Sequence, residues 1–585
     1  VTSYLLRLFQ APGYTYSDWN AYGGSLLPYL AYKSYWCCFA LLLLVLTEWW
    51  WRREYCASWR DRWRLVRSRW GRKRKAALLA ALIPWLLTGA WLYREEQAAA
   101  ASQPITEMQW RARLEQQFGQ LREQLSPKIT HIALDVMIQS DRSEWKAEGV
   151  YQLKNSSSSP IDTVLVYHHP LVQFALEWPD GKAFRLPADP LPGISLWHLE
   201  QPLLPDSSTS FHFRLLQKKQ HWLAADGPVG QNTTVLSDGW FPSIGYPSTL
   251  EISHPQQRRQ YKLPARSGDI ASTQRSYSGA AADRLHLQVS VQVPTGYTAL
   301  APGRLVHRAA TPDYVRFHYQ TQHPIKPNFA IHGGQYALRL DSLGGRQLRT
   351  YYHPDHAYNI KVLQEGLQAA LAYAEKQYGP CLHEEWRIIE FPLAEGSHAT
   401  LMDNQLLFSE AYFLFDREEA SIDLPFYVAA HEAAHHWWGN QLLPADAPGA
   451  KMLTESLAEY TALRVLRSAK GEKAYQTFLD YNRDLYLSQR QADDPPLYLA
   501  EAHQKHLHYR KGAIAFCALA DCWGEEALNQ ELSCFLEDHS MQGPPYPIAS
   551  DLLGRLKTAV PDSLQSLLSD YFEQYELPAH NCQRR

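Results

Sequence analysis

Two apolar runs dominate the first hundred residues of the chain. They occupy residues 34–51 and 76–93, and each is close to the roughly 20 residues with which a helix crosses a bilayer. Tryptophans cluster at the ends of the runs, as is typical of the interface between lipid and water. The pattern predicts a membrane segment at residues 1–100, with two transmembrane helices and the lipid bilayer as a partner.

The spacing of apolar positions changes after this segment. Residues 104–125 place apolar side chains on one helical face, which predicts an amphipathic helical linker within residues 101–128. From residue 129 to 345 apolar and polar positions alternate, most clearly in RLHLQVSVQV at 284–293, and after residue 346 the period is helical. We therefore expect an α+β multidomain chain, with an antiparallel β-sandwich or saddle domain at 129–345 and a mainly helical domain at 346–585.

Charge sets the expected orientation in the membrane. The chain has 57 Lys and Arg against 60 Asp and Glu, yet residues 52–75 hold eleven basic and only two acidic side chains. Because basic loops stay on the cytoplasmic side, this loop should be cytoplasmic, and everything after Arg94 should be extracytoplasmic. Outside the loop the chain is net acidic, so no nucleic-acid partner is expected.

The start of the chain adds to this picture. No Met begins it, and no charged segment with a cleavage site precedes the first apolar run. We interpret the chain as the C-terminal part of a longer protein that crosses the inner (cell) membrane several times. Its large domains would then lie in the periplasm or its equivalent outside the cell.

Candidate chemistry lies in the string His431-Glu432-Ala433-Ala434-His435. On a helix, positions i and i+4 share a face, so both imidazoles can bind one metal ion. Glu432 then lies beside the first ligand, where it can take a proton from metal-bound water. Asp423, followed by Leu424 and Pro425, predicts the start of this helix.

A third ligand is expected from Glu455, on a second predicted helix after a loop that contains Pro and Gly. Two His and one Glu leave a fourth position open for water, which is the arrangement of a catalytic zinc site. The alternative is an ordinary helix with two exposed histidines. We interpret His436 as a neighbour of the site, and Glu459 either as a packing carboxylate or as support for a ligand.

These motifs resemble the aminopeptidase N-like gluzincins. That family has HExxH, then a Glu ligand after eighteen residues, and W-x-G-N shortly after the second His. This chain has Trp437-Trp438-Gly439-Asn440, and Glu455 follows His435 after nineteen residues. The extra residue, the H-x-W-W-G and M-L-x-E-S-L-A-E-Y strings, YSDWNAYG at 16–23 and WFPSIGY at 240–246 look like the subgroup in which the peptidase is fused to ABC-transporter permease helices.

The resemblance implies a thermolysin-like catalytic domain, one Zn²⁺, a peptide substrate, and transporter subunits including an ATPase as partners. Tyr509 stands in Y-R-K-G-A, which is similar to the family's Y-x-K-G-A, and would donate to the oxyanion. The family's G-x-M-E-N glutamate, which binds the substrate amine, has Asp403 as its nearest counterpart here, with Glu395 as a competing candidate. Asp403 can equally be a turn residue.

The resulting hypothesis is a membrane-anchored zinc metallopeptidase that hydrolyses peptide bonds on the extracytoplasmic side, with aminopeptidase specificity. Its zinc ligands would be His431, His435 and Glu455, and its catalytic residues Glu432 and Tyr509. The alternative is a catalytically idle, peptide-binding or regulatory domain of an ABC-type transporter permease.

Overall fold

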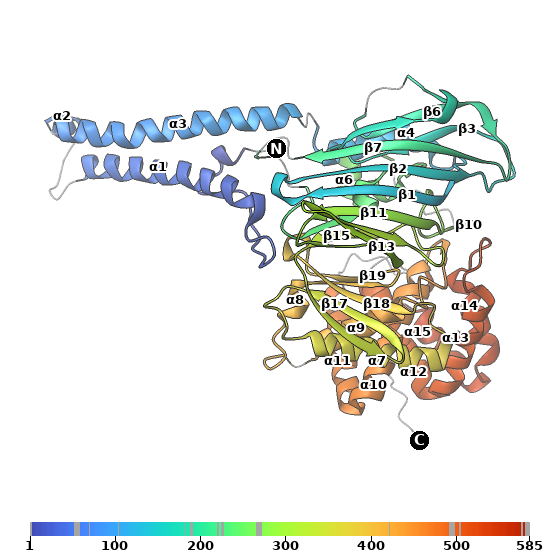
Figure 1. Ribbon diagram of the computed structural model, residues 1–585. Coiled ribbons are helices and arrows are strands. Elements are labelled where there is room, and N and C mark those ends of the chain that lie inside the picture. Colours follow the sequence, from blue (N-terminus) through green and yellow to red (C-terminus); the bar gives the residue numbers. More distant parts are fainter. Residues whose placement is uncertain are drawn as a thin grey trace.

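The structure is a computed structural model in which a pair of long helices projects from a β-rich domain (Figure 1). This domain packs on a mixed α/β domain, which is called the catalytic domain below after the role predicted from its sequence. It describes residues 3–51, 59–68, 71–102, 105–181, 183–187, 191–218, 222–223, 227–264, 272–420, 422–490, 498–501, 505–574 and 577–578. Part of the basic loop, residues 52–58 and 69–70, lies outside the described residues.

The projecting helices are α1 (Leu26–Trp50) and α3 (Arg72–Ser102), which lie side by side and run in opposite directions (Figure 1). The short helix α2 (Trp59–Ser68) lies between them in the chain. Both long helices contain an apolar stretch that is long enough to cross a membrane, with mean hydropathy 1.6 and 1.7. Only 22% and 11% of these stretches are buried, so neither helix is a core helix of the globular part.

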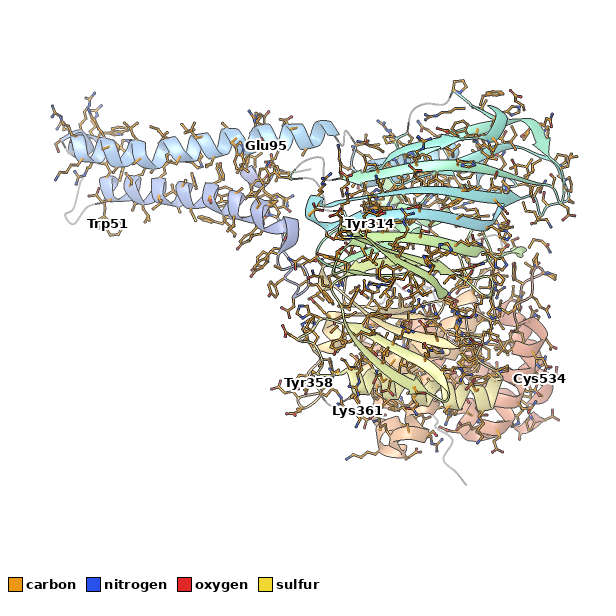
Figure 2. The ribbon with its side chains drawn as sticks, viewed as in Figure 1. Trp51, Glu95, Tyr314, Tyr358, Lys361 and Cys534 are labelled. Atoms are coloured by element: carbon orange, nitrogen blue, oxygen red, sulfur yellow. The ribbon has the colours of Figure 1, made fainter. Side chains whose placement is uncertain are left out.

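The base of the helix pair is attached to the β domain. The Trp222 indole stacks on Trp91 with ring centroids 4.9 Å apart, and its Nε1–H donates to Glu95 Oε2 at 2.9 Å. Figure 2 shows Glu95 toward this attached end and Trp51 near the far end of the pair. These contacts join the C-terminal part of α3 to the β domain.

The segment before α1 also contacts the catalytic domain. Trp19 is buried, Ser17 Oγ donates to Glu410 Oε2 at 3.0 Å, and Asp18 Oδ2 lies 2.9 Å from His356 Nε2. The N-terminal segment therefore ties the helix pair to the catalytic domain directly, and not only through the β domain.

The predicted linker contains helix α4 (Glu107–Phe118), which begins with a capping box between Thr106 and Gln109. Its Trp110, Leu114 and Phe118 are buried in a cluster with side chains of the β domain. The helix ends sooner than the sequence pattern suggests, since residues 119–121 form a 3-10 turn and Leu125 is exposed.

The β domain is built on a seven-stranded sheet in the order β13-β14-β11-β1-β2-β7-β4. Its strands are β1 (Lys128–Gln139), β2 (Glu144–Lys154), β4 (Gln173–Glu177), β7 (Ser208–Lys218), β11 (His286–Pro294), β13 (Arg304–Ala310) and β14 (Tyr314–Gln320). The predicted alternation is confirmed in β11, where Leu287, Val289, Val291 and Val293 are all buried.

Two smaller sheets complete this domain, along with helices α5 (Ser237–Trp240) and α6 (Pro255–Gln260). One contains β3 (Ile161–Tyr167), β5 (Ala183–Arg185), β6 (Ile194–Leu203) and β9 (Ser243–Ile244), and the other β8 (Thr233–Leu236), β12 (Thr298–Leu300) and β15 (Ala330–Gly334). The expectation of a purely antiparallel domain is wrong at one pair, because β1 and β11 run parallel. Such a pair needs a long crossover, and many intervening elements provide it.

The catalytic domain contains a five-stranded sheet in the order β16-β17-β18-β20-β19. Its strands are β16 (Ala337–Leu343), β17 (Arg346–Tyr352), β18 (Glu385–Phe391), β19 (Ala399–Met402) and β20 (Gln405–Ser409). Strands β17, β18 and β20 are parallel, and the two edge strands are antiparallel. Because β16 belongs to this sheet, the catalytic fold starts before residue 346.

Helices surround this sheet (Figure 1). They are α7 (Ile360–Tyr378), α8 (Glu410–Phe413), α9 (Leu424–Ala434), α10 (Leu457–Lys470), α11 (Glu472–Gln489), α12 (Gly512–Trp523), α13 (Glu525–His539), α14 (Ala549–Ala559) and α15 (Gln565–Phe572). The β and catalytic domains are joined by the pairing of β10 (Ser272–Ser276) with β21 (Ala445–Asp446). Arg284 adds hydrogen bonds from Nη2 to the carbonyls of Asn440 and Gln441, at 2.7 and 2.8 Å.

Candidate metal centre and cleft

Helix α9 carries the first two candidate ligands. It begins at Leu424 with Pro425 in its first turn, as predicted, because proline has no N–H to lose there. Asp423 precedes the helix without capping it, since its carboxylate accepts two hydrogen bonds from Arg417, at 3.0 and 2.9 Å. His431 lies in the last turn, and His435 is the C-cap residue.

His431, His435 and Glu455 come together although a segment that contains β21 separates Glu455 from α9 in the chain. The Nε2 atoms of the two imidazoles are 3.1 Å apart, and Glu455 Oε2 lies 3.7 Å from His431 Nε2 and 3.2 Å from His435 Nε2. Tetrahedral zinc with ligands at about 2.0–2.1 Å holds donor atoms roughly 3.3 Å apart. Glu455 Oε2 is buried and has no hydrogen-bond partner among the described residues, so the three residues fit a zinc ion.

Two π turns shape the site. Residues Met452–Ser456 form one, which presents Glu455 and leads into α10, and His506–Lys511 form the other, which presents Tyr509 and leads into α12. A π turn holds one residue more than an α turn, and such turns are frequent at functional sites. Glu455 was expected on a regular second helix. The structure places it in a π turn that is followed by a helix.

Neighbouring groups orient the imidazoles. His435 Nδ1 lies 3.0 Å from the Trp438 carbonyl, which leaves its Nε2 free for a metal ion. Glu459 Oε1 lies 3.6 Å from His431 Nδ1, and the Tyr427 hydroxyl donates to the Glu459 carboxylate. Glu459 was interpreted either as a packing carboxylate or as support for a ligand, and its place beside His431 matches the second interpretation.

His436 is directed elsewhere. Its Nε2 accepts a hydrogen bond of 3.0 Å from the Leu382 N–H, and its ring packs against Trp386 and His383. The structure therefore places His436 outside the candidate ligand set, as the sequence analysis expected.

Three carboxylates lie around His431, and Lys451 and Arg510 are the cations beside two of them, Glu455 and Glu459. Burial opposes protonation of His431, but the carboxylates of Glu459, Glu455 and Glu432 outweigh it and raise the pKa of His431 to about 9. Burial also opposes ionisation of Glu455, yet the two histidines and Lys451, 3.0 Å away, hold its pKa well below the usual range. The carboxylates stabilise positive charge at the two imidazoles, where a metal ion would bind.

Glu432 and Tyr509 face the same cleft as His435 and Glu455. Glu432 is buried, and burial raises the pKa of its carboxyl group. The ring of Tyr509 lies 6.0 Å from that of His431, and burial together with the Glu455 carboxylate raises the pKa of its hydroxyl. Tyr509 therefore keeps its proton at neutral pH and can donate a hydrogen bond.

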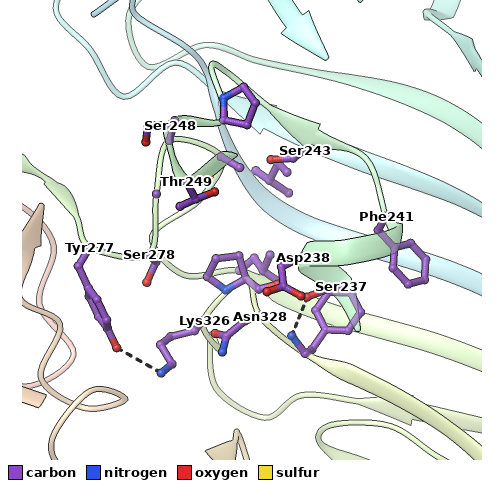
Figure 3. Close-up of a pocket in the computed structure, with 18 of the residues that line it drawn as sticks. Ser237, Asp238, Phe241, Ser243, Ser248, Thr249, Tyr277, Ser278, Lys326 and Asn328 are labelled. Carbon is purple, nitrogen blue, oxygen red and sulfur yellow. Dashed lines mark hydrogen bonds between the residues drawn. The ribbon is translucent and has the colours of Figure 1, made fainter. Parts of the chain in front are cut away.

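The cleft has a volume of about 500 Å³ and lies between the β and catalytic domains. One wall comes from the β domain, whose Ser237, Asp238, Ser248 and Thr249 are drawn in Figure 3. The other wall contains residues 399–401 of β19 and the candidate metal ligands His435 and Glu455. A molecule bound beside β19 in this cleft would thus lie between the two domains.

The structure does not bring Asp403 to this cleft. Asp403 lies in the two-residue turn between β19 and β20 with φ 56°, which asparagine and aspartate tolerate better than most residues. Its Oδ2 accepts a hydrogen bond of 3.1 Å from the Gly303 N–H, and its Oδ1 lies 3.4 Å from His383 Nε2. Asp403 lines a separate cavity, so the geometry matches the interpretation as a turn residue.

Glu395 is not brought to the cleft either. It ends the 3-10 turn Leu393–Glu395 and is exposed. Three further charged residues line the cleft that were not predicted from the sequence, namely Asp238, Lys326 and Lys451. Only Lys451 carries a local signal, since it stands four residues before Glu455 on the same turn of backbone.

Comparisons with known proteins agree with this geometry. The model of the Peptidase family M1 domain matches residues 395–572, and a search of curated proteins gives no match. The M1 zinc metallopeptidase from Deinococcus radiodurans has a similar structure, with TM-score 0.56 and 16% identity over 79% of this chain and 97% of that chain.

Two ligand complexes are similar as well. A mutant two-domain M1 zinc metallopeptidase bound to L-tryptophan matches with TM-score 0.55 and 15% identity, over 79% of this chain and 97% of that one. A Deinococcus radiodurans mutant bound to a Tyr-Ser-Ala substrate matches with TM-score 0.54 and 16% identity, over 78% and 96%. The chain thus has the fold of M1 zinc metallopeptidases, and its residues 395–572 match the Peptidase family M1 domain.

Proposed function

We propose that the chain is a membrane-anchored zinc metallopeptidase that hydrolyses peptide bonds, with aminopeptidase specificity. The observation that carries the proposal is the convergence of His431 Nε2, His435 Nε2 and Glu455 Oε2 within 3.7 Å of one another. Glu432 and Tyr509 lie in the same cleft, so ligands, base and oxyanion donor are together. An idle domain has no physical need for this complete set.

Each side chain has one task in the proposed reaction. A zinc ion held by His431, His435 and Glu455 would supply Lewis-acid polarisation of the peptide carbonyl and of water. Glu432 takes the proton of the attacking water and delivers it to the nitrogen of the leaving amine as the C–N bond breaks. Tyr509 donates its hydroxyl proton in a hydrogen bond to the oxygen that becomes negative.

Aminopeptidase specificity requires a carboxylate for the substrate ammonium group. Neither Asp403 nor Glu395 lines the cleft, whereas Asp238 does and makes no ion pair with any described residue. We propose that Asp238 binds the amine, because Glu432 and Glu455 already have other tasks. A carboxylate–ammonium pair of this kind is a charge-assisted hydrogen bond.

The test is a hydrolysis assay on the purified full-length chain in detergent, with its zinc content measured. We expect one equivalent of zinc, removal of N-terminal residues from a mixture of free peptides, and at least tenfold slower cleavage of the N-acetylated copies. Internal cleavage of free and acetylated peptides alike would establish an endopeptidase. Bound zinc without cleavage of any peptide would support the alternative, an idle peptide-binding or regulatory domain of a transporter permease.

The membrane anchor in this proposal is the pair α1 and α3. Their apolar stretches are mostly exposed, a state that costs free energy in water and none in lipid. The basic residues that connect the helices are expected on the cytoplasmic side, which places the peptidase outside, in the periplasm or its equivalent. Permease helices and an ATPase subunit are the partners implied by the resemblance to transporter-fused peptidases.

This topology predicts a difference in labelling on intact cells. In a background without reactive cysteines, Ala98→Cys should react with a membrane-impermeant maleimide, and Ser68→Cys should react only after the cells are permeabilised. The charge of residues 52–75 is the physical reason, because it opposes translocation of the loop. Labelling of Ser68→Cys from outside the cell, with Ala98→Cys protected, would reverse the proposed orientation.

A further inference from the structure

Two lysines that line the cleft lie close to the same tyrosine. Lys326, from the loop between β14 and β15, has its Nζ 5.9 Å from the ring centroid of Tyr277 and 3.4 Å from its hydroxyl (Figure 3). Lys451, which precedes the π turn of Glu455, has its Nζ 5.6 Å from the same centroid. The ring of Tyr277 thus has an ammonium group from each domain beside it.

The two ammonium groups differ in their partners. Lys451 Nζ lies 3.0 Å from Glu455 Oε1, so its charge is neutralised by a candidate metal ligand. Lys326 is half-buried, and no carboxylate of the described residues lies within ion-pair distance of it. Its polar contact is the neutral hydroxyl of Tyr277. A partly buried charge without a counter-ion is unfavourable, and an anion at this point would relieve the cost.

The summed charge of the cleft also favours the binding of an anion. Its carboxylates are Asp238, Glu432 and Glu455, and Lys326 and Lys451 oppose them. Addition of one divalent cation makes the cleft net positive. Burial and the neighbouring Lys451 lower the pKa of Lys326 to about 8, which leaves most of its ammonium groups charged at neutral pH.

We infer that Lys326, with Tyr277 beside it, forms a subsite that binds a carboxylate of the peptide substrate next to the cleavage site. The inference deepens the proposed function and rests on it for the peptide nature of the ligand. The carboxylate belongs either to an acidic side chain or to the C-terminus of a short peptide. In both cases the ammonium group of Lys326 donates to it. Tyr277 positions this ammonium group, because its hydroxyl accepts from Lys326 Nζ at 3.4 Å and donates to the Gly439 carbonyl at 3.5 Å.

Binding tests this subsite without hydrolysis. The zinc-loaded full chain with Glu432→Gln is titrated by calorimetry with four versions of one tetrapeptide. These have Glu or Gln at an internal position, each with a free or an amidated C-terminus. A charge-assisted hydrogen bond predicts that removal of the recognised carboxylate weakens binding about 10- to 100-fold. The version that loses affinity identifies the source of the carboxylate, and equal binding of all four overturns the inference.

A second comparison assigns the effect to Lys326. Lys326→Met should abolish the preference for the carboxylate while zinc content is retained, and Lys326→Arg should keep it. Lys361→Met is the matched control, since Lys361 lies on the outer surface of α7 with a side chain 77% exposed (Figure 2). A preference that survives in a folded, zinc-loaded Lys326→Met protein overturns the inference.

The two proposals fail in different ways. Absence of hydrolysis by the unmodified protein, together with carboxylate-selective binding, would refute the peptidase and leave the subsite standing. Hydrolysis without any carboxylate preference would refute the subsite and leave the peptidase. The peptide series on the Glu432→Gln protein gives its answer even when Lys326→Met does not fold.

Discussion

Glu432→Gln is expected to retain its zinc and to lose about 10²- to 10⁴-fold in turnover, the range contributed by a positioned general base. Glu432 lies in the cleft beside the candidate ligands, but it is not one of the three residues whose ligand atoms converge on the metal position. Glutamine has the same shape as glutamate and cannot accept the proton of water. Burial raises the pKa of Glu432 and so makes its carboxylate a stronger base. The measurements are kcat on a peptide substrate and zinc per chain.

Glu418→Gln is the matched control for this variant. Glu418 is exposed in the segment between α8 and α9, so the same chemical change there should leave both kcat and zinc content unaltered. A Glu432→Gln protein with undiminished turnover would remove Glu432 from the mechanism. Loss of zinc from that protein would show instead that the carboxylate helps to hold the metal.

The periodicity of the sequence was sufficient to predict which site residues lie together when those residues belong to one helix. The i, i+4 spacing of His431 and His435 places both imidazoles on one face, and the structure has their Nε2 atoms 3.1 Å apart. Alternation in β11 likewise predicted a buried face. Local spacing does not encode strand direction, however, and for that reason the parallel pairing of β1 with β11 was not foreseen.

The π turns and the position of Asp403 depend on tertiary structure. A π turn differs from an α turn by one residue in its hydrogen-bond register. The two π turns, Met452–Ser456 and His506–Lys511, pack against each other, and a local helix propensity does not encode such a contact. The string around Asp403 is compatible with a cleft residue or with a hairpin turn. The pairing of β19 with β20, in which Met402 faces Gln405, places Asp403 in the turn.

Of the two cations of the cleft, Lys326 has no signature in the sequence, and Lys451 has only its place four residues before Glu455. Lys326 and Tyr277 come from loops of the β domain, and Lys451 comes from the catalytic domain. They meet because β10 pairs with β21 and because Arg284 binds the carbonyls that follow the HExxH helix. A long-range contact between domains thus creates the subsite, and the same contact holds the β domain over the metal ligands.

Glu455→Gln is expected to weaken zinc binding by at least the 10- to 100-fold that loss of a supporting residue costs, because the substituted residue is itself a ligand. A neutral amide is a poor ligand for a divalent cation. The change also leaves the ammonium group of Lys451, 3.0 Å from the present carboxylate, without its partner and close to the metal. Zinc affinity measured by competition with a chelator gives the size of the effect.

Thermal unfolding supplies a readout that does not depend on activity. Zinc that binds only the folded chain raises Tm, so chelation should lower the Tm of the unmodified protein, and the shift should be largely absent in Glu455→Gln. Glu472→Gln, at the exposed start of α11, serves as control and should keep the full shift. A Glu455→Gln protein that retains one equivalent of tightly bound zinc would show that the metal is held without this carboxylate. The nineteen residues between His435 and Glu455 would then mark a departure from the ligand set of the gluzincins that the chain resembles, and not a spacing that the π turn accommodates.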